Sequence, residues 1–262
     1  MILFLAENRF VIPVVCVLLL ASYHNYRKDK EFLHTLTSHL PVFLIKEYTL
    51  ITLPFAGMEM IKGYSHKPMG TVALGTHLGN FSKEDSLKYV EAIKYAVRNG
   101  IYSIDGAINY RGMCSERDEG VALAELMNSG IITREEVFIS SKAGLLYGDI
   151  SAKLPPMKYL SEKLENKGIS IEDFSEYEGL FQTLNPAFYE IALNKSLENL
   201  GLEMIDVYYI HIPEITKLKL TEDEFYEKME MLIRWYETKC FEGKIRYYGC
   251  LLYTSDAADD KA

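Results

Sequence analysis

Four residues suited to acid–base chemistry follow apolar segments of this 262-residue sequence: Asp105, Tyr110, Lys142 and His211. We predict that the apolar segments are buried β-strands, at residues 101–104, 137–141 and 207–210. In a parallel β/α architecture, every strand points its C-terminal end at the same face of the sheet. We therefore expect the four side chains to converge on that face.

These residue types suit the reduction of a carbonyl group. Hydride addition to carbon leaves negative charge on oxygen, so a proton donor must stand beside that oxygen. A tyrosine hydroxyl has an unperturbed pKa of about 10 and holds its proton at neutral pH. A nearby ammonium such as Lys142 favours the phenolate and lowers the pKa of Tyr110. Asp105 would keep Lys142 charged and oriented, while a ring N–H of His211 would orient the carbonyl oxygen.

Helical patterns alternate with the predicted strands. Four segments carry apolar residues at helical spacing, and each begins with a capping signal, at Ser82, Ser115, Asn185 and Thr221. A glycine follows each segment, at Gly100, Gly130, Gly201 and Gly243. Two further strands, at 71–75 and 245–249, bring the total to five strands and four helices in strict alternation. The strands are apolar without period-two alternation, as expected for strands covered on both faces. The predicted fold class is α/β.

Four motifs in this order resemble the aldo/keto reductase family, at residues 75–79, 100–110, 196–213 and 243–249. The similar region covers about residues 71–249 and includes all four residues of the expected site. The resemblance implies a (β/α)8 TIM-type barrel. Residues 58–249 would form its N-terminal part, with about five of the eight β/α units present.

The resemblance also implies an activity and a cofactor. The chain would belong to an NADP-dependent oxidoreductase that reduces an aldehyde or ketone to an alcohol, or catalyses the reverse, with a small carbonyl or alcohol as substrate. Tyr110 would be the general acid. The residues implied to bind the nicotinamide end of NADP(H) are Gly75, Thr76, His77 and Asp105.

Other interpretations of the same residues stay open. Singly, Asp105 could be a turn residue, Tyr110 an ordinary packing residue among 19 tyrosines, and Lys142 a solvated lysine. A cofactor-binding regulatory subunit without significant turnover is the main alternative function. An unrelated barrel lyase or isomerase could instead use Lys142 as a Schiff-base amine.

Two segments depart from the commoner family pattern. The loop at residues 111–114 is longer than usual before Ser115 and Glu116, which we expect to be a helix cap and a first-turn carboxylate near the cofactor. Residues 145–183 are also long for a β-to-α connection. We expect a surface excursion with a short helix there, which either shapes substrate access or is a surface insertion without that role.

The two ends of the chain resemble nothing in the family. Residues 1–57 contain apolar runs, and they are either mis-called upstream sequence, a membrane anchor or export signal, or a folded extension. Membrane association is expected only through this extension. Residues 250–262 resemble the translation of a transposase adapter used in sequencing libraries, so we expect an artefactual tail after a truncated barrel.

The composition fits an ordinary globular protein, with 48% hydrophobic and 25% charged residues. A formal net charge of −9 argues against nonspecific binding to nucleic acid. The four cysteines and six histidines show no metal-ligand spacing, so no metal is expected, and a reducing cytoplasm fits the cysteines. The sequence lacks a G-x-G-x-x-G motif and a P-loop, which argues against a Rossmann dehydrogenase and a nucleotide hydrolase.

Overall fold

The five predicted strands form one parallel sheet in the computed structural model, which describes residues 72–251. Each strand pairs with the next in the order β1, β2, β3, β6 and β7. Their bounds are Ala73–Gly75, Ser103–Asp105, Phe138–Ala143, Ile205–His211 and Ile245–Leu251. The predicted α/β class is confirmed, and the C-terminal ends of all five strands share one edge of the sheet.

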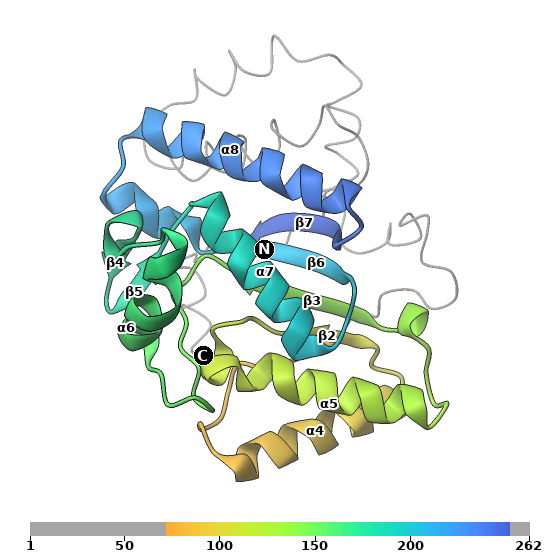
Figure 1. Cartoon of the computed structure of the whole chain (residues 1–262). Helices are drawn as coiled ribbons and strands as arrows, with labels where there is room; N and C mark the ends of the chain where they lie inside the picture. Colours follow the sequence, from red (N-terminus) through yellow and green to blue (C-terminus); the bar gives the residue numbers. More distant parts are fainter. Residues whose placement is uncertain (1–71, 252–262) are drawn as a thin grey trace, which may run out of the picture. The chain divides into compact units, whose positions relative to one another are not determined.

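Four helices connect these strands: α4 (Lys83–Arg98), α5 (Cys114–Asn128), α7 (Pro186–Leu200) and α8 (Glu222–Phe241). Figure 1 shows α5 and α7 lying across the strands, with α4 beside α5 and α8 beside β7. Each helix packs against the next one along the sheet. Two adjacent parallel strands need a long crossover connection, and in this sheet an α-helix provides each one.

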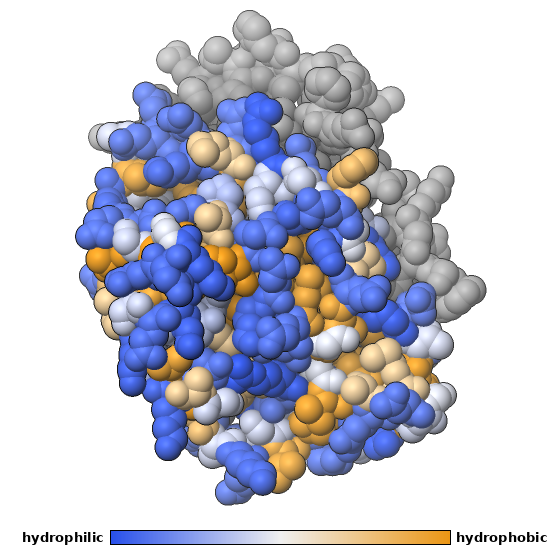
Figure 2. Space-filling model, in the orientation of Figure 1, coloured by the Kyte–Doolittle hydropathy of each residue, from blue (hydrophilic) through white to orange (hydrophobic). Residues whose placement is uncertain are grey.

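The core lies between the helices and the sheet. Fully buried apolar side chains come from every one of these helices, for example Ile93, Leu123, Phe188 and Leu232. Burying one such side chain contributes about 1.5–3 kcal/mol. Figure 2 shows the solvent-facing surface of the molecule in the same orientation as Figure 1. This surface is largely hydrophilic, with smaller apolar areas. None of the helices in residues 72–251 has the length and apolar character needed to cross a membrane.

Three of the four predicted helix caps are confirmed. The Ser82 side chain accepts a hydrogen bond from the Asp85 N–H, and the Asn185 side chain accepts one from the Ala187 N–H. Thr221 forms a complete capping box at the start of α8.

The predicted cap at Ser115 is wrong. Helix α5 begins at Cys114, one residue before Ser115. Met113 occupies the N-cap position in a left-handed conformation (φ 70°) and makes no side-chain hydrogen bond there. The Ser115 hydroxyl is buried and points to Thr76 and Glu119 instead. A serine inside the first turn can bond inward when buried polar groups face it, and the sequence alone does not reveal those groups.

Removing the confirmed cap at Thr221 should lower stability modestly. In Thr221→Ala the Glu224 N–H loses its side-chain acceptor, and we expect the free energy of unfolding to fall by about 1 kcal/mol. Urea unfolding measures the change. Thr238→Ala is the matched control, because this exposed threonine lies inside the same helix and only bonds back to the Arg234 carbonyl. Equal losses in the two variants would contradict the cap.

Residues 144–185 form the expected excursion, between β3 and α7. It contains the predicted short helix, α6 (Pro156–Tyr159), and a β-hairpin that was not predicted, of β4 (Ser175–Tyr177) and β5 (Leu180–Gln182). The prediction of strict alternation is therefore wrong at this point. The hairpin closes through Glu178 and Gly179, which both have positive φ (51° and 80°), as a type I′ turn requires. Glu-Gly is a weaker signal for that turn than Asn-Gly, and the two strands are only three residues long.

The expectations for residues 1–57 and 252–262 lie outside the described residues. Strand β7 continues through Cys250 and Leu251, which pair with Ile210 and His211 of β6. The strand therefore extends two residues past the expected barrel boundary at Gly249.

Candidate active site

The structure brings the four predicted site residues together at the C-terminal edge of the sheet. Asp105 is the last residue of β2, and His211 is the last residue of β6. Lys142 is the penultimate residue of β3, the strand between them. Tyr110 follows β2 after a four-residue connection and begins a short 3-10 turn. Parallel pairing brings the strand residues to one edge with a stagger of two residues per strand. Asp105 is in register with Ser140, two residues before Lys142, and Lys142 is in register with Tyr209, two residues before His211.

Lys142 is held by two oxygen atoms. Its ammonium donates hydrogen bonds to Asp105 Oδ2 at 2.8 Å and to the Gly106 carbonyl at 2.7 Å. The Lys142 side chain is only 3% exposed, so the pairing compensates a buried positive charge. The Ser140 hydroxyl donates to the other oxygen of Asp105 at 2.6 Å and fixes that carboxylate. These contacts leave the ammonium in one orientation.

The Tyr110 ring lies between the cation and two imidazoles. Lys142 Nζ lies 4.8 Å from the centroid of the Tyr110 ring. The ring centroids of His77 and His211 lie 4.6 and 5.7 Å from the Tyr110 centroid, both in edge-on arrangements. A cation near the face of an aromatic ring is attracted by the ring electrons.

His211 is a neutral imidazole at neutral pH. Its pKa is lowered to about 3, mainly by burial, with a smaller contribution from the nearby Lys142 ammonium. A neutral imidazole keeps one N–H donor, which suits it to orient a carbonyl oxygen without adding charge. The backbone carbonyl of His211 accepts a 3.4 Å hydrogen bond from the Gln182 side chain. The excursion thus contacts the site directly through its second hairpin strand.

The predicted cofactor residues lie beside Tyr110, but they differ in accessibility. Gly75 pairs with Asp105 across the sheet, and a Cβ added to it would meet no atom within 4 Å. His77 is exposed and contacts the Tyr110 ring. Thr76 is buried, with its hydroxyl directed at the Asp105 carbonyl, Ser115 and Glu119. Its backbone N–H also donates to the Asp105 carbonyl at 3.1 Å, so the Thr76 hydroxyl and N–H are both already engaged.

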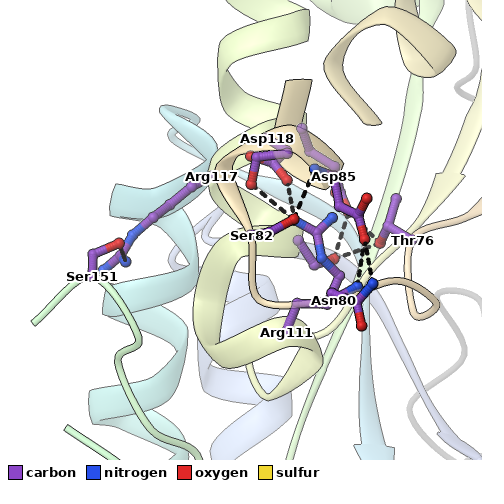
Figure 3. A network of polar contacts seen from close by, with 11 residues as sticks. Thr76, Asn80, Ser82, Asp85, Arg111, Arg117, Asp118 and Ser151 are labelled. Atoms are coloured by element: carbon purple, nitrogen blue, oxygen red, sulfur yellow. Dashed lines mark hydrogen bonds and ion pairs between the residues drawn. The ribbon is translucent and has the colours of Figure 1, made fainter. Parts of the chain in front are cut away.

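The loop after Tyr110 has an unusual backbone. Arg111, Gly112 and Met113 all have positive φ (49°, 58° and 70°), and left-handed conformations are costly for residues other than glycine. Two interactions hold this loop. Arg111 is buried and forms an ion pair with Asp118 at 2.6 Å, and Met113 is fully buried. Figure 3 shows Arg111 beside Asp118 and near the segment that carries Asn80 and Asp85.

A second arginine connects the site loops to the excursion. Arg117 of α5 donates two parallel hydrogen bonds to Asp149, each 2.8 Å long, and a third to Ser151 at 2.9 Å. Figure 3 shows this side chain extending away from the Arg111 cluster. The Arg117 hydrogen bond holds the pKa of Asp149 below its ordinary value. Bidentate pairing of this kind fixes the relative position of the two segments.

Ser140, Gln182 and Glu119 were not identified from the sequence. Ser140 had a recognisable signal, because a polar residue in a strand buried on both faces must find a hydrogen-bond partner. Glu119 had one too, since it lies four residues after Ser115 and four before Leu123 on the buried face of α5. Gln182 had none, because its strand was not predicted.

Glu116 lies on the buried face of α5. Its buried carboxylate accepts hydrogen bonds from Ser141 at 2.6 Å and from Asn199 at 2.9 Å. Burial raises its pKa, and these hydrogen bonds oppose that effect. Glu116 therefore connects α5 to β3 and α7. Among residues 72–251, no group of three or more His, Cys, Asp and Glu side chains is arranged to hold a metal ion.

The fold is that of a parallel β/α protein of barrel type, with a cluster of ionisable side chains at the strand ends. Residues 68–259 match the Aldo/keto reductase family, and the chain belongs to that family. The family fold is a (β/α)8 barrel, and the described residues form about five of its β/α units.

The chain is also similar to particular relatives. It is 30% identical over 165 residues to aldo-keto reductase AKR2E4 of Bombyx mori, covering 63% of this chain and 40% of the relative. It is 30% identical over 172 residues to glyoxal reductase of Bacillus subtilis, covering 66% and 43%. Among solved structures, the aldo-keto reductase AKR11C1 of Bacillus halodurans has a TM-score of 0.49 at 21% identity, over 75% of this chain and 50% of that one. The chain thus spans less than half the length of these two sequence relatives.

Proposed function

We propose that the complete protein is an NADP(H)-dependent oxidoreductase that reduces a small aldehyde or ketone to an alcohol, or catalyses the reverse reaction. Family membership supports this class, as do the names of relatives such as glyoxal reductase and NAD(P)H-dependent D-xylose reductase. The observation that carries the proposal is the buried pair of Lys142 and Asp105 beside the Tyr110 ring, with a neutral His211 next to the same ring.

In this mechanism each of the four residues has a separate role in the reaction at the carbonyl oxygen. His211 donates its N–H to that oxygen and fixes the plane of the substrate. Tyr110 donates the proton that the oxygen needs as it becomes an alcohol. Lys142 stabilises the phenolate that remains, and Asp105 keeps the ammonium in place. In the reverse direction, the phenolate of Tyr110 accepts the alcohol proton.

The proposed cofactor supplies or accepts the hydride when bound. The residues beside Tyr110 fit a flat nicotinamide ring, because Gly75 leaves open space and the His77 ring is exposed. Gly75 and His77 would border the ring. Thr76 would contribute its backbone, and Asp105 would act through Lys142. We place the protein in the cytoplasm, because Cys114 and Cys240 are free thiols, which suits a reducing compartment.

The test is an NADPH oxidation assay with a panel of small aldehydes and ketones. It uses the complete gene product, because this chain spans less than half of its sequence relatives. We expect turnover at about 1 s⁻¹ or faster with the best substrate. The Lys142→Met variant, which removes the cation beside Tyr110, is the inactive control. A single burst without turnover would favour the regulatory-subunit alternative, and trapping of substrate on Lys142 by borohydride would favour a Schiff-base enzyme.

A further inference from the structure

A buried carboxyl group lies directly beneath the candidate site. Glu119 of α5 is 0% exposed, and its Oε1 lies 2.8 Å from the Thr76 hydroxyl and 3.2 Å from the Ser115 hydroxyl. Thr76 and Ser115 also bond to each other, and Thr76 Oγ1 lies 3.2 Å from the Asp105 carbonyl oxygen. The mechanism described above does not use Glu119.

The two oxygens of this carboxyl group have different surroundings. Thr76 and Ser115 both direct their hydroxyl groups at Oε1, whereas Oε2 is buried without a hydrogen-bond partner among the described residues. Burying a charged carboxylate with one oxygen unpaired is costly, and a proton on Glu119 removes that charge.

The surrounding charges favour the same form. Glu119 makes no ion pair among the described residues, and Lys142 directs its ammonium at Asp105 and the Gly106 carbonyl instead. The charged groups that face Glu119 are acids, Glu116 on its own helix and Asp105 on β2. Burial raises the pKa of Glu119 to about 8, the Thr76 and Ser115 hydrogen bonds oppose the increase, and the two acids add to it.

Glu119 also supports the backbone that holds Lys142. A Cβ added to Gly106 would lie 2.4 Å from Glu119 Oε1, so the carboxyl group contacts the Gly106 backbone. The carbonyl of that same glycine accepts the Lys142 ammonium at 2.7 Å. Thr76 and Gly106 follow neighbouring strands, β1 and β2. One carboxyl group therefore contacts both connections that lie under Asp105 and Lys142.

We propose that Glu119 is a positioning residue which, in its protonated form, holds Thr76 and Gly106 in place under the Asp105–Lys142 pair. Loss of the proton leaves an uncompensated negative charge that faces two other acids. The inference rests on the proposed function, because it is through that pair that Glu119 affects the reaction.

The sign of the pH dependence follows from this assignment. The pKa of Glu119 is higher in the folded protein, about 8, than the ordinary value of 4.5. The neutral form therefore stabilises the fold fully below pH 4.5, and the contribution is lost as the pH rises toward 8. Carbonyl reduction should decline over the upper part of the same range, as the support under Lys142 is lost.

The experiment compares the complete protein with Glu119→Gln, which carries a neutral amide of the same shape. The melting temperature without cofactor and the kcat for carbonyl reduction are measured at closely spaced pH values between about 5 and 9. We expect the native melting temperature to fall as the pH rises and to level off near pH 8, and the Glu119→Gln profile to be flatter. We expect the pH at which kcat declines on the alkaline side to be higher by about one unit or more in the variant. Glu125→Gln, the same change at an exposed position of α5, should keep the native profiles.

A second variant keeps the test decisive if Glu119→Gln does not fold. Ser115→Ala removes one hydrogen bond that favours the charged carboxylate, so the pH at which the melting profile levels off should increase. Native turnover together with unshifted Glu119→Gln profiles would overturn the role of Glu119. If Ser115→Ala alone folds, an unshifted levelling-off pH in that variant would overturn it. Absence of carbonyl reduction by the native protein would overturn the proposed function, and with it the catalytic part of this inference.

Discussion

Replacing Tyr110 by Phe should lower kcat for carbonyl reduction by about 10²-fold or more, because general acid catalysis commonly contributes 10²–10⁴-fold. The substitution removes only the hydroxyl group. The ring keeps its edge-on contacts with His77 and His211 and its contact with the Lys142 ammonium. We therefore expect NADPH binding, measured by fluorescence titration, to stay within about twofold of the native value.

A matched tyrosine separates this effect from a general loss of structure. Tyr95 lies on α4 and is 71% exposed, so Tyr95→Phe should leave kcat and the melting temperature unchanged. If Tyr110→Phe retained native turnover, Tyr110 would not be the acid. If it lost turnover and cofactor binding together, the hydroxyl would serve the cofactor site instead.

Replacing Asp118 by Ala should produce the largest loss of stability. Asp118 pairs with Arg111 at 2.6 Å, and the Arg111 side chain is only 2% exposed. Removing one partner of a buried ion pair leaves the other charge uncompensated and costs about 3–5 kcal/mol. Burial raises the pKa of Asp118 although Arg111 opposes the shift, which shows that desolvation outweighs the ion pair for this carboxylate. Urea unfolding measures the loss of stability.

Two controls test the assignment to the buried pair. Glu84→Gln breaks an exposed pair with Lys88 and should cost no more than about 1 kcal/mol. The double variant Asp118→Leu with Arg111→Met removes both charges, so it should be more stable than Asp118→Ala. A double variant as unstable as the single one would show that packing, rather than the unpaired charge, carries the cost.

Asp118→Ala should also affect activity, because Arg111 lies in the loop directly after Tyr110. Arg111 follows Tyr110 directly and begins three consecutive residues with positive φ, which the pair with Asp118 helps to hold. Without that support the loop should relax toward less costly conformations and displace Tyr110. We therefore expect Asp118→Ala to lower kcat as well, under conditions in which the variant is still folded.

Most of the sheet and the central site could be predicted because they depend on local patterns and one topological rule. The apolar strands were recognisable from composition, and the parallel arrangement then brought Asp105, Lys142 and His211 to one edge. Caps such as Thr221 were recognisable because their hydrogen bonds are local, within three residues.

The parts that were missed depend on contacts between distant residues. The cap at Ser115 was wrong because its hydroxyl bonds to Thr76, 39 residues away. The hairpin was missed because its strands have three residues each and its turn lacks the usual sequence signal. The left-handed run at residues 111–113 leaves no local signature apart from Gly112, since an ion pair and a buried methionine stabilise it.

The first and last residues of the excursion lie side by side. The segment could therefore be exchanged as a unit between related enzymes. The Thr183 N–H donates to the Gly144 carbonyl at 2.9 Å, and the Leu146 N–H donates to the Phe181 carbonyl at 2.7 Å. The tip at Glu178 and Gly179 can therefore vary in length while the strand ends keep their spacing. The junction itself tolerates less, because Gly144 has a φ of +126° and a Cβ there would lie 2.5 Å from the Tyr189 hydroxyl. A graft that keeps Gly144 and Gln182 should leave the backbone of His211 supported.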